Sequence, residues 1–406
     1  MCKDVFFPAD VLVPQGVSLE KWSVIACDQF SSEREYWRRV RERVGEAPST
    51  LNMIVPEAFL REIDEEAEIS GIKRAMAGYL ESKLLQVIGN SFVYVERTFA
   101  DSRVRRGLVG AVDLEEYDFS GGAAPIRASE GTVLDRLPLR RRVRRAVELE
   151  STHIITFIDD KEETVIEPLS GKADGLPLLY EFDLMEGGGH IRGMRVSGGD
   201  AAIVMERLRA LHEKNGMLMV VGDGNHSLAA AKLCWDEVKK SLSGQERDNH
   251  PARMALVEMN NVYDPAVSFE AIHRVVFNAG AEELLKTLEN DLPYGNDYRL
   301  RWVHDGKSGS IGTGAKCFGD MIKAVQGALD RYVSCNGGCY IDYIHDEASV
   351  LSLAGGNRCF GLLLPSMDKS ELFGTVVSGG VFPRKSFSVG KSREKRYYME
   401  CRKIVD

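Results

Sequence analysis

The chain has 406 residues, more than the roughly 250–300 that a single hydrophobic core usually holds, so its length predicts at least two domains. Hydrophobic residues make up 44% and charged residues 28% of the sequence, a balance that excludes intrinsic disorder and collagen-like repeats. The 52 Lys and Arg residues against 61 Asp and Glu residues give a formal net charge of −9. So acidic a chain is poorly suited to general nucleic-acid binding, which depends on a basic surface.

Three features of the sequence concern the compartment of the protein. No apolar run approaches the ~18 residues that a membrane span needs. The first apolar stretch is interrupted by Asp4, Pro8 and Asp10, which is untypical of a signal peptide. Eight cysteines are too few for a disulfide scaffold in a chain of this length, so reduced thiols are expected. We therefore expect a cytoplasmic protein whose partners include neither a membrane nor nucleic acid.

Short apolar runs between polar turns predict strands in the first half of the chain. These runs are Trp22–Phe30, Phe92–Glu96, Gly107–Asp113, His153–Asp159, Glu163–Pro168, Tyr180–Leu184 and His190–Val196. The polar stretches Asp159–Glu162 and Glu186–Gly189 each separate two runs and predict two hairpins. Helices are predicted after the N-cap pair Ser31 and Ser32 and in the acidic segment that opens at Pro56.

In the second half, helices and strands alternate without a regular βαβ order. A helix over Ala201–Lys214 should end at the C-cap signal Asn215-Gly216. Further strands are predicted at Met217–Val221, Met254–Met259, Tyr340–Ile344 and Cys359–Leu363, and further helices at about Ala281–Asp291, Lys316–Tyr332 and Asp368–Val377. This pattern is typical of an α+β fold with mixed sheets and flanking helices.

The polar stretch Ser241–Asn249 is the nearest approach to a break in composition. We place a domain boundary there. The expected halves are an N-terminal α+β domain over residues 1–245 and a C-terminal α/β domain over residues 246–406, both contributing to one site.

The most informative segment is the turn Gly222–Ser227, GDGNHS, between an apolar strand and a helix. Gly222 and Gly224 allow a sharp backbone turn and leave no side chain to obstruct a ligand. The first turn of the following helix offers unpaired N–H groups and a partial positive charge. Such a helix start suits a phosphate or a carboxylate.

Polar side chains fill the same turn. Asp223 can hold a metal ion or orient a hydroxyl group, and Asn225, His226 and Ser227 can donate to anionic oxygens. The alternative is structural, because Asp223 and Asn225 can also cap the helix through an Asx turn. Four polar side chains exceed what a cap requires, which favours a binding role.

Six arginines fall within the ten residues Arg136–Arg145. A helix that starts at Pro138 aligns Arg140 with Arg144 on one stripe. Three interpretations stay open. The stripe is a solvated face paired with the acidic helix near Glu65, a phosphate-binding wall, or a nucleic-acid contact. The third lacks aromatic residues for base stacking.

Just before this run, Glu130 lies between Arg127 and Arg136 in the sequence. A carboxylate flanked by arginines can act as the general base for a hydroxyl nucleophile. The arginines can stabilise the charge on a transferred phosphoryl group. A structural salt bridge between Glu130 and Arg136 is the alternative.

Further candidates are scattered along the chain. Asp28 is the second candidate metal ligand or a helix cap, and Cys27 beside it has no sequence neighbour that would activate it as a nucleophile. His273 and Arg274 lie among apolar residues and indicate either an enclosed anion pocket or a core histidine. Lys385 can supply a phosphate-binding cation or be an ordinary surface lysine.

Seven segments together resemble the domain of unknown function 1015 family, and the resemblance covers nearly the whole chain. They are Ala26–Trp37, Pro48–Glu57, Val93–Thr98, Ile126–Arg140, Val221–Lys232, Phe269–Phe277 and Val381–Arg402. The turn also looks like the DGHHR-type turn of the ParB/sulfiredoxin-like superfamily, which includes ADP-dependent free serine kinases. The resemblance implies a ParB/sulfiredoxin-like core that holds a nucleotide or phosphate at Asp223–Ser227, and we expect ATP or ADP with Mg²⁺ as the cofactor. Many members carry His-His-Arg where this chain has Asn225-His226-Ser227, so a phosphate-gripping arginine is missing from the turn.

Together, the residues and the resemblance predict a nucleotide-dependent phosphotransferase on a small hydroxylated metabolite, with free serine the most concrete candidate. The reverse reaction would dephosphorylate phosphoserine. The expected catalytic residues are Glu130, Asp223 and His226, and the expected metal ligands are Asp223 and Asp28. Nucleotide and phosphate contacts are expected from Gly222, Gly224, Asn225, Ser227, Arg127, Arg136, His273, Arg274 and Lys385. The alternative is a non-enzymatic nucleotide-binding regulator of the ParB-like type.

Overall fold

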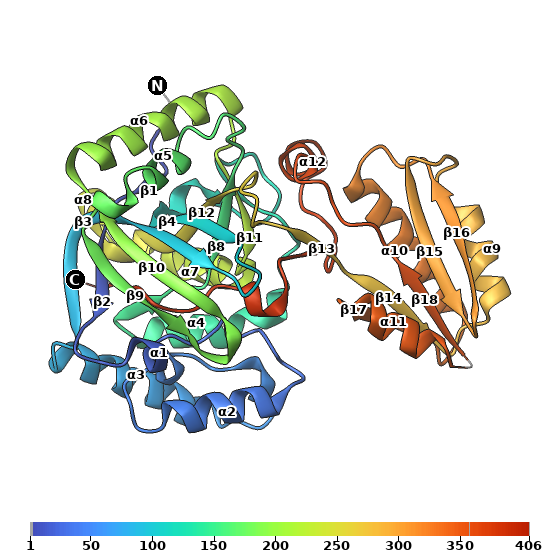
Figure 1. The fold of residues 1–406 in the computed structure, drawn as a ribbon, viewed down its shortest axis with the longest axis horizontal. Coiled ribbons are helices and arrows are strands. Elements are labelled where there is room, and N and C mark those ends of the chain that lie inside the picture. Colours follow the sequence, from blue (N-terminus) through green and yellow to red (C-terminus); the bar gives the residue numbers. More distant parts are fainter. Residues whose placement is uncertain (1–2, 357, 406) are drawn as a thin grey trace. The chain divides into compact units, whose positions relative to one another are not determined.

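The computed structural model describes residues 3–356 and 358–405, and the chain divides into two compact units (Figure 1). Unit 1 comprises Met1–Ala128, Thr132–Val267 and Lys391–Asp406, and unit 2 comprises Ser129–Gly131 and Ser268–Gly390. This division differs from the expected halves 1–245 and 246–406. The reason is strand pairing, because β12 (Met254–Asn261) and the C-terminal β20 (Cys401–Lys403) both belong to the sheet of unit 1.

Within the described part of the chain, unit 1 is built on one mixed sheet of 13 strands. Ten strands follow in the order β5 (Tyr117–Asp118), β6 (Ile126–Ala128), β11 (Met219–Asp223), β8 (Ile155–Ile158), β12, β4 (Val104–Asp113), β3 (Leu85–Thr98), β2 (Ala9–Pro14), β20 and β7 (Leu149–Ser151). β1 (Phe6–Phe7) pairs with β4, and the hairpin of β9 (Leu178–Leu184) and β10 (Gly189–Val196) extends from β3. Pairs β5–β6, β6–β11 and β8–β12 are parallel, whereas β3–β4 and β4–β12 are antiparallel. The mixture of strand directions confirms the α+β class.

Two hydrophobic clusters cover the two faces of this sheet. Val93 and Val95 on β3 belong to one cluster, while Phe92 and Tyr94 belong to the other. Because successive side chains of a strand point to opposite faces, this alternation places the two clusters on opposite sides. The sheet therefore carries a core on each face.

The helices of unit 1 begin and end at local signals. They are α1 (Leu19–Trp22), α2 (Arg34–Val44), α3 (Glu65–Glu81), α4 (Leu137–Ala146), α5 (Glu167–Ser170), α6 (Gly198–Asn215), α7 (Asn225–Val238) and α8 (Gly244–Asn249). The carboxylate of Asp64 caps α3 by accepting from the N–H groups of Glu66 and Ala67. α6 ends at Gly216, whose φ of 71° only glycine adopts without cost, as the sequence predicts. None of the described helices is both long and apolar enough to cross a bilayer.

Unit 2 contains a five-stranded antiparallel sheet in the order β16 (Lys307–Thr313), β15 (Tyr298–His304), β18 (Cys359–Leu363), β14 (His273–Phe277) and β17 (Tyr340–Ile344). Its helices are α9 (Ala281–Asp291), α10 (Phe318–Cys335), α11 (Glu347–Ala354) and α12 (Glu371–Gly379). A separate two-stranded pair joins β13 (Phe269–Ala271) and β19 (Phe387–Val389). The sequence predicts β17, β18, α9, α10 and α12 but gives no signal for β15, β16 or α11.

Two of the predicted strands are wrong. Within Trp22–Phe30 only Ile25 forms a bridge, to Tyr397, and the run ends in a turn. Glu163–Pro168 forms no strand: it is a loop, with Val165 and Ile166 buried, that runs into the first two residues of α5. The carboxylate of Asp160 accepts from the N–H groups of Thr164 at 2.7 Å and Val165 at 2.9 Å. These bonds close a turn where the sequence predicts a hairpin. The acidic helix expected from Pro56 also begins later, at Glu65, after a 3-10 turn over Glu57–Phe59.

Replacing Asp160 with Ala tests this turn. Asp160 is fully buried, and its loss removes the acceptor of two N–H groups, the buried one of Val165 and the partly buried one of Thr164. The free energy of unfolding should fall by about 3 kcal/mol, as expected for bonds to a charged group. Urea unfolding measures the change, and Asp10→Ala at an exposed position is the control. Equal stabilities of the two variants would contradict the role of Asp160.

Candidate functional site

The predicted turn after β11 is present, and its glycines are required by packing. β11 ends at Asp223, and Gly224, with a φ of 77°, is the N-cap of α7. A Cβ atom on Gly222 would lie 2.2 Å from Cε2 of Phe157, and one on Gly224 would lie 2.9 Å from Cγ1 of Ile154. Both glycines therefore pack closely against the chain at β8, Gly222 against Phe157 and Gly224 against Ile154, just before the strand. From the sequence we expected them to leave room for a ligand.

Asp223 is held on both carboxylate oxygens. Oδ1 accepts from the N–H of Gly224 at 2.9 Å, and Oδ2 lies 3.2 Å from Nζ of Lys395. The Asp223 side chain is 13% exposed and the Lys395 side chain 7%. α7 has no side-chain N-cap bond, so Asp223 does not act as its cap. The ion pair places one carboxylate and one ammonium group at the start of α7.

His226 ties the first turn of α7 to the segment before α4. Its Nε2 accepts from the backbone N–H of Val133 at 3.2 Å. A ring nitrogen accepts only when it carries no proton, so this bond is compatible with a neutral imidazole that is protonated on Nδ1.

The ammonium group at Asp223 comes from a segment that the sequence did not place at the site. We expected the phosphate-binding cation at Lys385, which is an exposed residue of unit 2 with a φ of 59°. Lys395 instead belongs to the C-terminal run Glu394–Arg402, several of whose charged side chains are buried. The segment lies within the last of the seven family-like stretches, but its charges are typical of a solvated surface.

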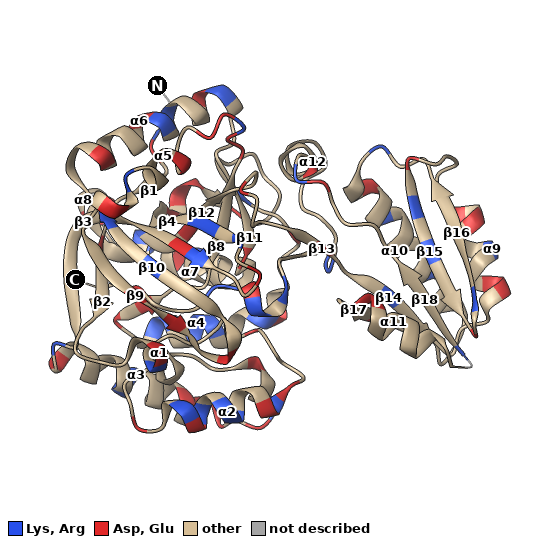
Figure 2. Ribbon diagram, viewed as in Figure 1, with Lys and Arg blue, Asp and Glu red and all other residues tan. Residues whose placement is uncertain are grey.

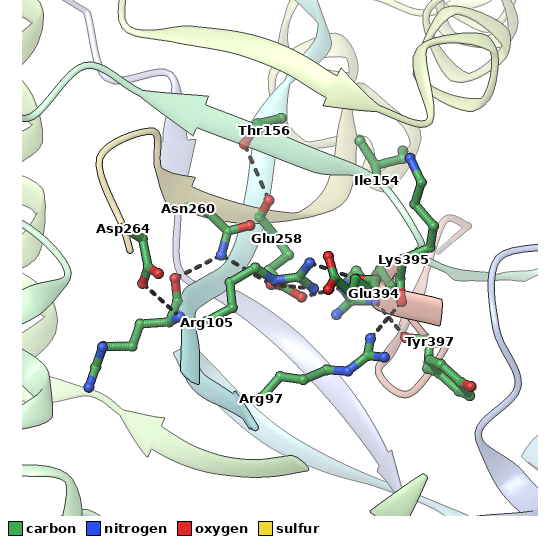
Figure 3. A network of polar contacts seen from close by, with 12 residues as sticks. Arg97, Arg105, Ile154, Thr156, Glu258, Asn260, Asp264, Glu394, Lys395 and Tyr397 are labelled. Carbon is green, nitrogen blue, oxygen red and sulfur yellow. Dashed lines mark hydrogen bonds and ion pairs between the residues drawn. The ribbon is translucent and has the colours of Figure 1, made fainter. Parts of the chain in front are cut away.

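Figure 3 shows the network of buried charges that fixes this segment. Arg97 on β3 donates to the backbone carbonyl of Lys395 at 2.5 Å. Arg396 donates through Nε to Glu258 on β12 at 2.7 Å and through Nη2 to Glu400 at 2.6 Å. These bonds fix the backbone at Lys395 to the sheet, from where its side chain contacts Asp223 at the end of β11.

Asp28 and His153 share the electrostatic environment of this pair. Asp28 lies in the turn after Ala26, where Gln29 donates to its Oδ1 at 3.0 Å. Burial acts to raise the pKa of Asp28, but His153, the Gln29 hydrogen bond and Lys395 together hold it below its usual value. His153 is 5% exposed, and burial lowers its pKa against the attraction of Asp28 and Asp223. The two expected metal ligands therefore interact with one shared imidazole.

The residues around Asp223 fit a metal ion that arrives with a ligand better than one held by the protein alone. Within the described ranges, no group of three or more His, Cys, Asp and Glu side chains could hold a metal ion. Mg²⁺ is commonly bound by one or two carboxylates together with phosphates and waters. Asp223 and Asp28 could supply those carboxylates.

A cavity of about 160 Å³ opens beside the turn. Ser227 and His153 contribute to its wall, together with Cys27. Burial and the neighbouring Asp28 carboxylate raise the pKa of Cys27 to about 12, so the thiol stays protonated near neutral pH. A thiol in this state is a poor nucleophile.

The arginines of α4 are paired with carboxylates. The pairs are Arg140 with Glu57, Arg141 and Arg145 with Glu237, Arg142 with Glu65 and Glu66, and Arg144 with Glu150. The contact with Glu65 confirms the paired face expected as one interpretation of the stripe. In Figure 2 basic and acidic positions are interspersed over both units. Arg127 is also engaged, because its Nε donates to the carbonyl of Ala124 at 2.9 Å, and Arg136 is exposed.

Four of the expected residues belong to unit 2. Glu130 accepts from the backbone N–H of Ser386 at 3.2 Å, and Arg274 lies over the ring of Tyr343 at 4.8 Å. Burial lowers the pKa of Arg274 to about 10, against the attraction of Tyr343 and Glu130. Its buried Nη2 has no hydrogen-bond partner in the part of the chain that the structure describes. A buried donor of this kind is what an anion pocket needs.

The other two expected residues of unit 2, His273 and Lys385, differ in burial. His273 is buried, its Nδ1 accepts from the N–H of Leu364 at 3.1 Å, and burial lowers its pKa. This environment agrees with the alternative of a core histidine. Lys385, at the exposed position given above, is accessible to solvent.

The ion pair between Lys395 and Asp223 can be tested by replacement. Lys395→Met leaves a carboxylate without its partner at a nearly buried position and should lower the free energy of unfolding by about 3 kcal/mol. The matched control is Lys403→Met, which removes an exposed lysine of β20. Urea unfolding of Lys395→Met, Asp223→Asn and the double variant should show a double loss smaller than the sum. Additive losses would mean that the two groups do not interact.

The packing of Gly222 generates a second prediction. Gly222→Ala places a methyl group against Phe157 and should cost about 2–3 kcal/mol of stability. Gly199→Ala in α6 meets nothing within 4 Å and is the matched control. Thermal unfolding should show a lower midpoint for the first variant only. An unchanged unfolding midpoint in Gly222→Ala would contradict the packing role and favour the interpretation that this glycine leaves space for a ligand.

Comparisons with known proteins give a family and remote likenesses. No curated protein matches the chain. Similar solved structures include SbnI with C-terminal truncation from Staphylococcus aureus, with 10% identity, a TM-score of 0.38 and coverage of 70% of this chain and 82% of that one. A conserved hypothetical protein from Pyrococcus furiosus has 10% identity, a TM-score of 0.37 and coverage of 73% and 94%. A free serine kinase in complex with AMP has 12% identity, a TM-score of 0.38 and coverage of 71% and 90%. Likeness at this level carries no argument about activity.

The family match is much broader. The family described as protein of unknown function (DUF1015) matches residues 12–368. This range includes Asp28, Glu130, Asp223 and Arg274 and ends before Lys395. The chain therefore belongs to the DUF1015 family.

Proposed function

We propose that the chain is a nucleotide-dependent phosphotransferase that acts on a small hydroxylated metabolite. The observation that carries the proposal is the buried pair of Asp223 and Lys395 at the start of α7, next to a cavity. A nearly buried ammonium group beside helix N–H groups attracts an anion more strongly than an exposed lysine does. Free serine is the most concrete acceptor, and phosphoserine is the substrate if the reaction runs in reverse.

Phosphate binding would fall to unit 1. The N–H groups of the first turn of α7 and Nζ of Lys395 would hold phosphate oxygens, and Ser227 would donate its hydroxyl hydrogen. Bound ATP or ADP would supply the phosphoryl group together with Mg²⁺, toward which Asp223 and Asp28 could each present a carboxylate. Lys395 takes the part for which the sequence had suggested Lys385.

From the sequence, the candidate base for proton transfer is Glu130, which lies in unit 2. A carboxylate that accepts the proton of an attacking hydroxyl group contributes typically 10²–10⁴-fold to a rate. Within unit 2, Arg274 attracts Glu130. His226 would hold the turn in place through its bond to Val133.

Phosphate transfer can be followed directly by ³¹P NMR with Mg²⁺, ADP or ATP and a panel of amino and hydroxy acids. Asp223→Asn should reduce the rate by about 100-fold or more, because it removes the charge that positions Lys395. Glu130→Gln should cause a loss of similar size by removing the base. The matched controls are Asp10→Asn and Glu81→Gln at exposed positions.

The outcomes separate the alternatives. An absence of product with serine would sink the serine assignment, and an unchanged rate in Glu130→Gln would remove Glu130 as the base. Tight nucleotide binding without transfer to any acceptor would favour the non-enzymatic regulator.

A further inference from the structure

The cavity beside the turn has an apolar wall. Among the side chains that line it are Met53, Leu60, Met76, Leu139, Val143 and Ala230. They come from the segment before α3, from α3 itself, from α4 and from α7. Its volume of about 160 Å³ is close to that of the ~150 Å³ apolar cavity that binds benzene in a well-studied engineered protein.

Most polar side chains in the same wall are already engaged by the protein. Arg140 pairs with Glu57 at 2.5 Å, the Ser151 hydroxyl donates to the carbonyl of Glu400 at 2.9 Å, and the Thr152 hydroxyl oxygen accepts from the N–H of Ile154 at 3.0 Å. Arg144 pairs with Glu150 through Nη1 at 2.7 Å, and its buried Nη2 is the one donor of this set without a hydrogen-bond partner among the described residues. An occupant would gain few hydrogen bonds from these groups. A purine would bring several ring nitrogens and leave them unpaired, at a cost for each. An alkyl or phenyl group has no polar atoms to satisfy.

We propose that this cavity binds a branched alkyl or phenyl group of the acceptor, an assignment that rests on the proposed phosphotransferase function. His153 and Ser227 lie in the wall of the same cavity. An acceptor whose apolar group fills the cavity can therefore place its hydroxyl group at the polar end, near the start of α7. On this inference the preferred acceptors are hydroxylated compounds with an apolar body of ring size, which would replace free serine as the acceptor named above.

The cavity can be tested without nucleotide or phosphate transfer. The probes are benzyl alcohol and 3-methyl-1-butanol, with glycerol as a polar comparison and adenosine as a source of a purine. Binding to the full chain is measured by saturation-transfer difference NMR and by the shift of the unfolding midpoint. Both alcohols should bind the wild type, and glycerol and adenosine should not bind at this position.

Ala230→Leu fills the cavity from α7, and the matched control is Ala210→Leu on the exposed face of α6. The filled variant should bind both alcohols at least tenfold more weakly, a loss of about 1.4 kcal/mol. Its own unfolding midpoint should stay at the wild-type value or rise, because the new side chain occupies existing space. Ala210→Leu should bind like the wild type. If Ala230→Leu fails to fold, Val143→Phe fills the same space from α4.

Each outcome decides the inference. Failure of both alcohols to bind, or unchanged binding in both filled variants, would overturn it. Displacement of benzyl alcohol by adenosine would overturn the acceptor assignment and make the cavity a base pocket. Alcohol binding that Ala230→Leu abolishes, in a protein that transfers no phosphate, would support the cavity as a binding site while the proposed function fails.

Discussion

The arrangement of the site depends on the pairing of buried charges between the C-terminal segment and the sheet of unit 1. Arg396 contacts Glu258 on β12 and Glu400, and all three side chains are almost fully buried. Removing one partner from such a group leaves a buried charge uncompensated, so the loss of any one of the three destabilises the fold. Their pairing fixes the register of the segment, with β20 between β2 and β7, and brings Lys395 to Asp223. Arg396, which attaches the C-terminal segment to the sheet, is thus the sequence neighbour of Lys395, which pairs with Asp223 in the candidate site.

Much of the fold could be predicted where the signals are local. α6 ends at a glycine, α9 has the predicted bounds, and the hairpin of β9 and β10 turns at Glu186–Gly189 as expected. Predictions failed where burial came from tertiary contacts. Val165 and Ile166 are fully buried in a loop, so their apolar run resembles a strand. β16 has few strand-forming residues, and its backbone pairs with β15.

The part of the candidate site that lies in one continuous segment could be predicted from the sequence, and the parts that come from distant segments could not. The turn from Gly222 to Ser227 is one segment, so its position between a strand and a helix follows from the local sequence. Asp28 could be proposed because a carboxylate followed an apolar run. Lys395 and His153 could not be placed at the site, because they reach it only through long-range packing. Charged runs such as Glu394–Arg402 are usually solvent-exposed, and only the sheet shows that this one is buried.

The insertion of unit 2 between Val267 and Lys391 has a consequence for protein synthesis. Ribosomes make the chain from its N-terminus, so residues 268–390 emerge before the segment that completes the sheet of unit 1. Until then β2 and β7 have no β20 between them, and each exposes a strand edge that could pair with another chain. A product of premature termination before residue 391 also lacks the ammonium group for Asp223. Translation must therefore pass residue 395 before a copy can form the charge pair. Copies that terminate earlier keep exposed strand edges, which favour aggregation.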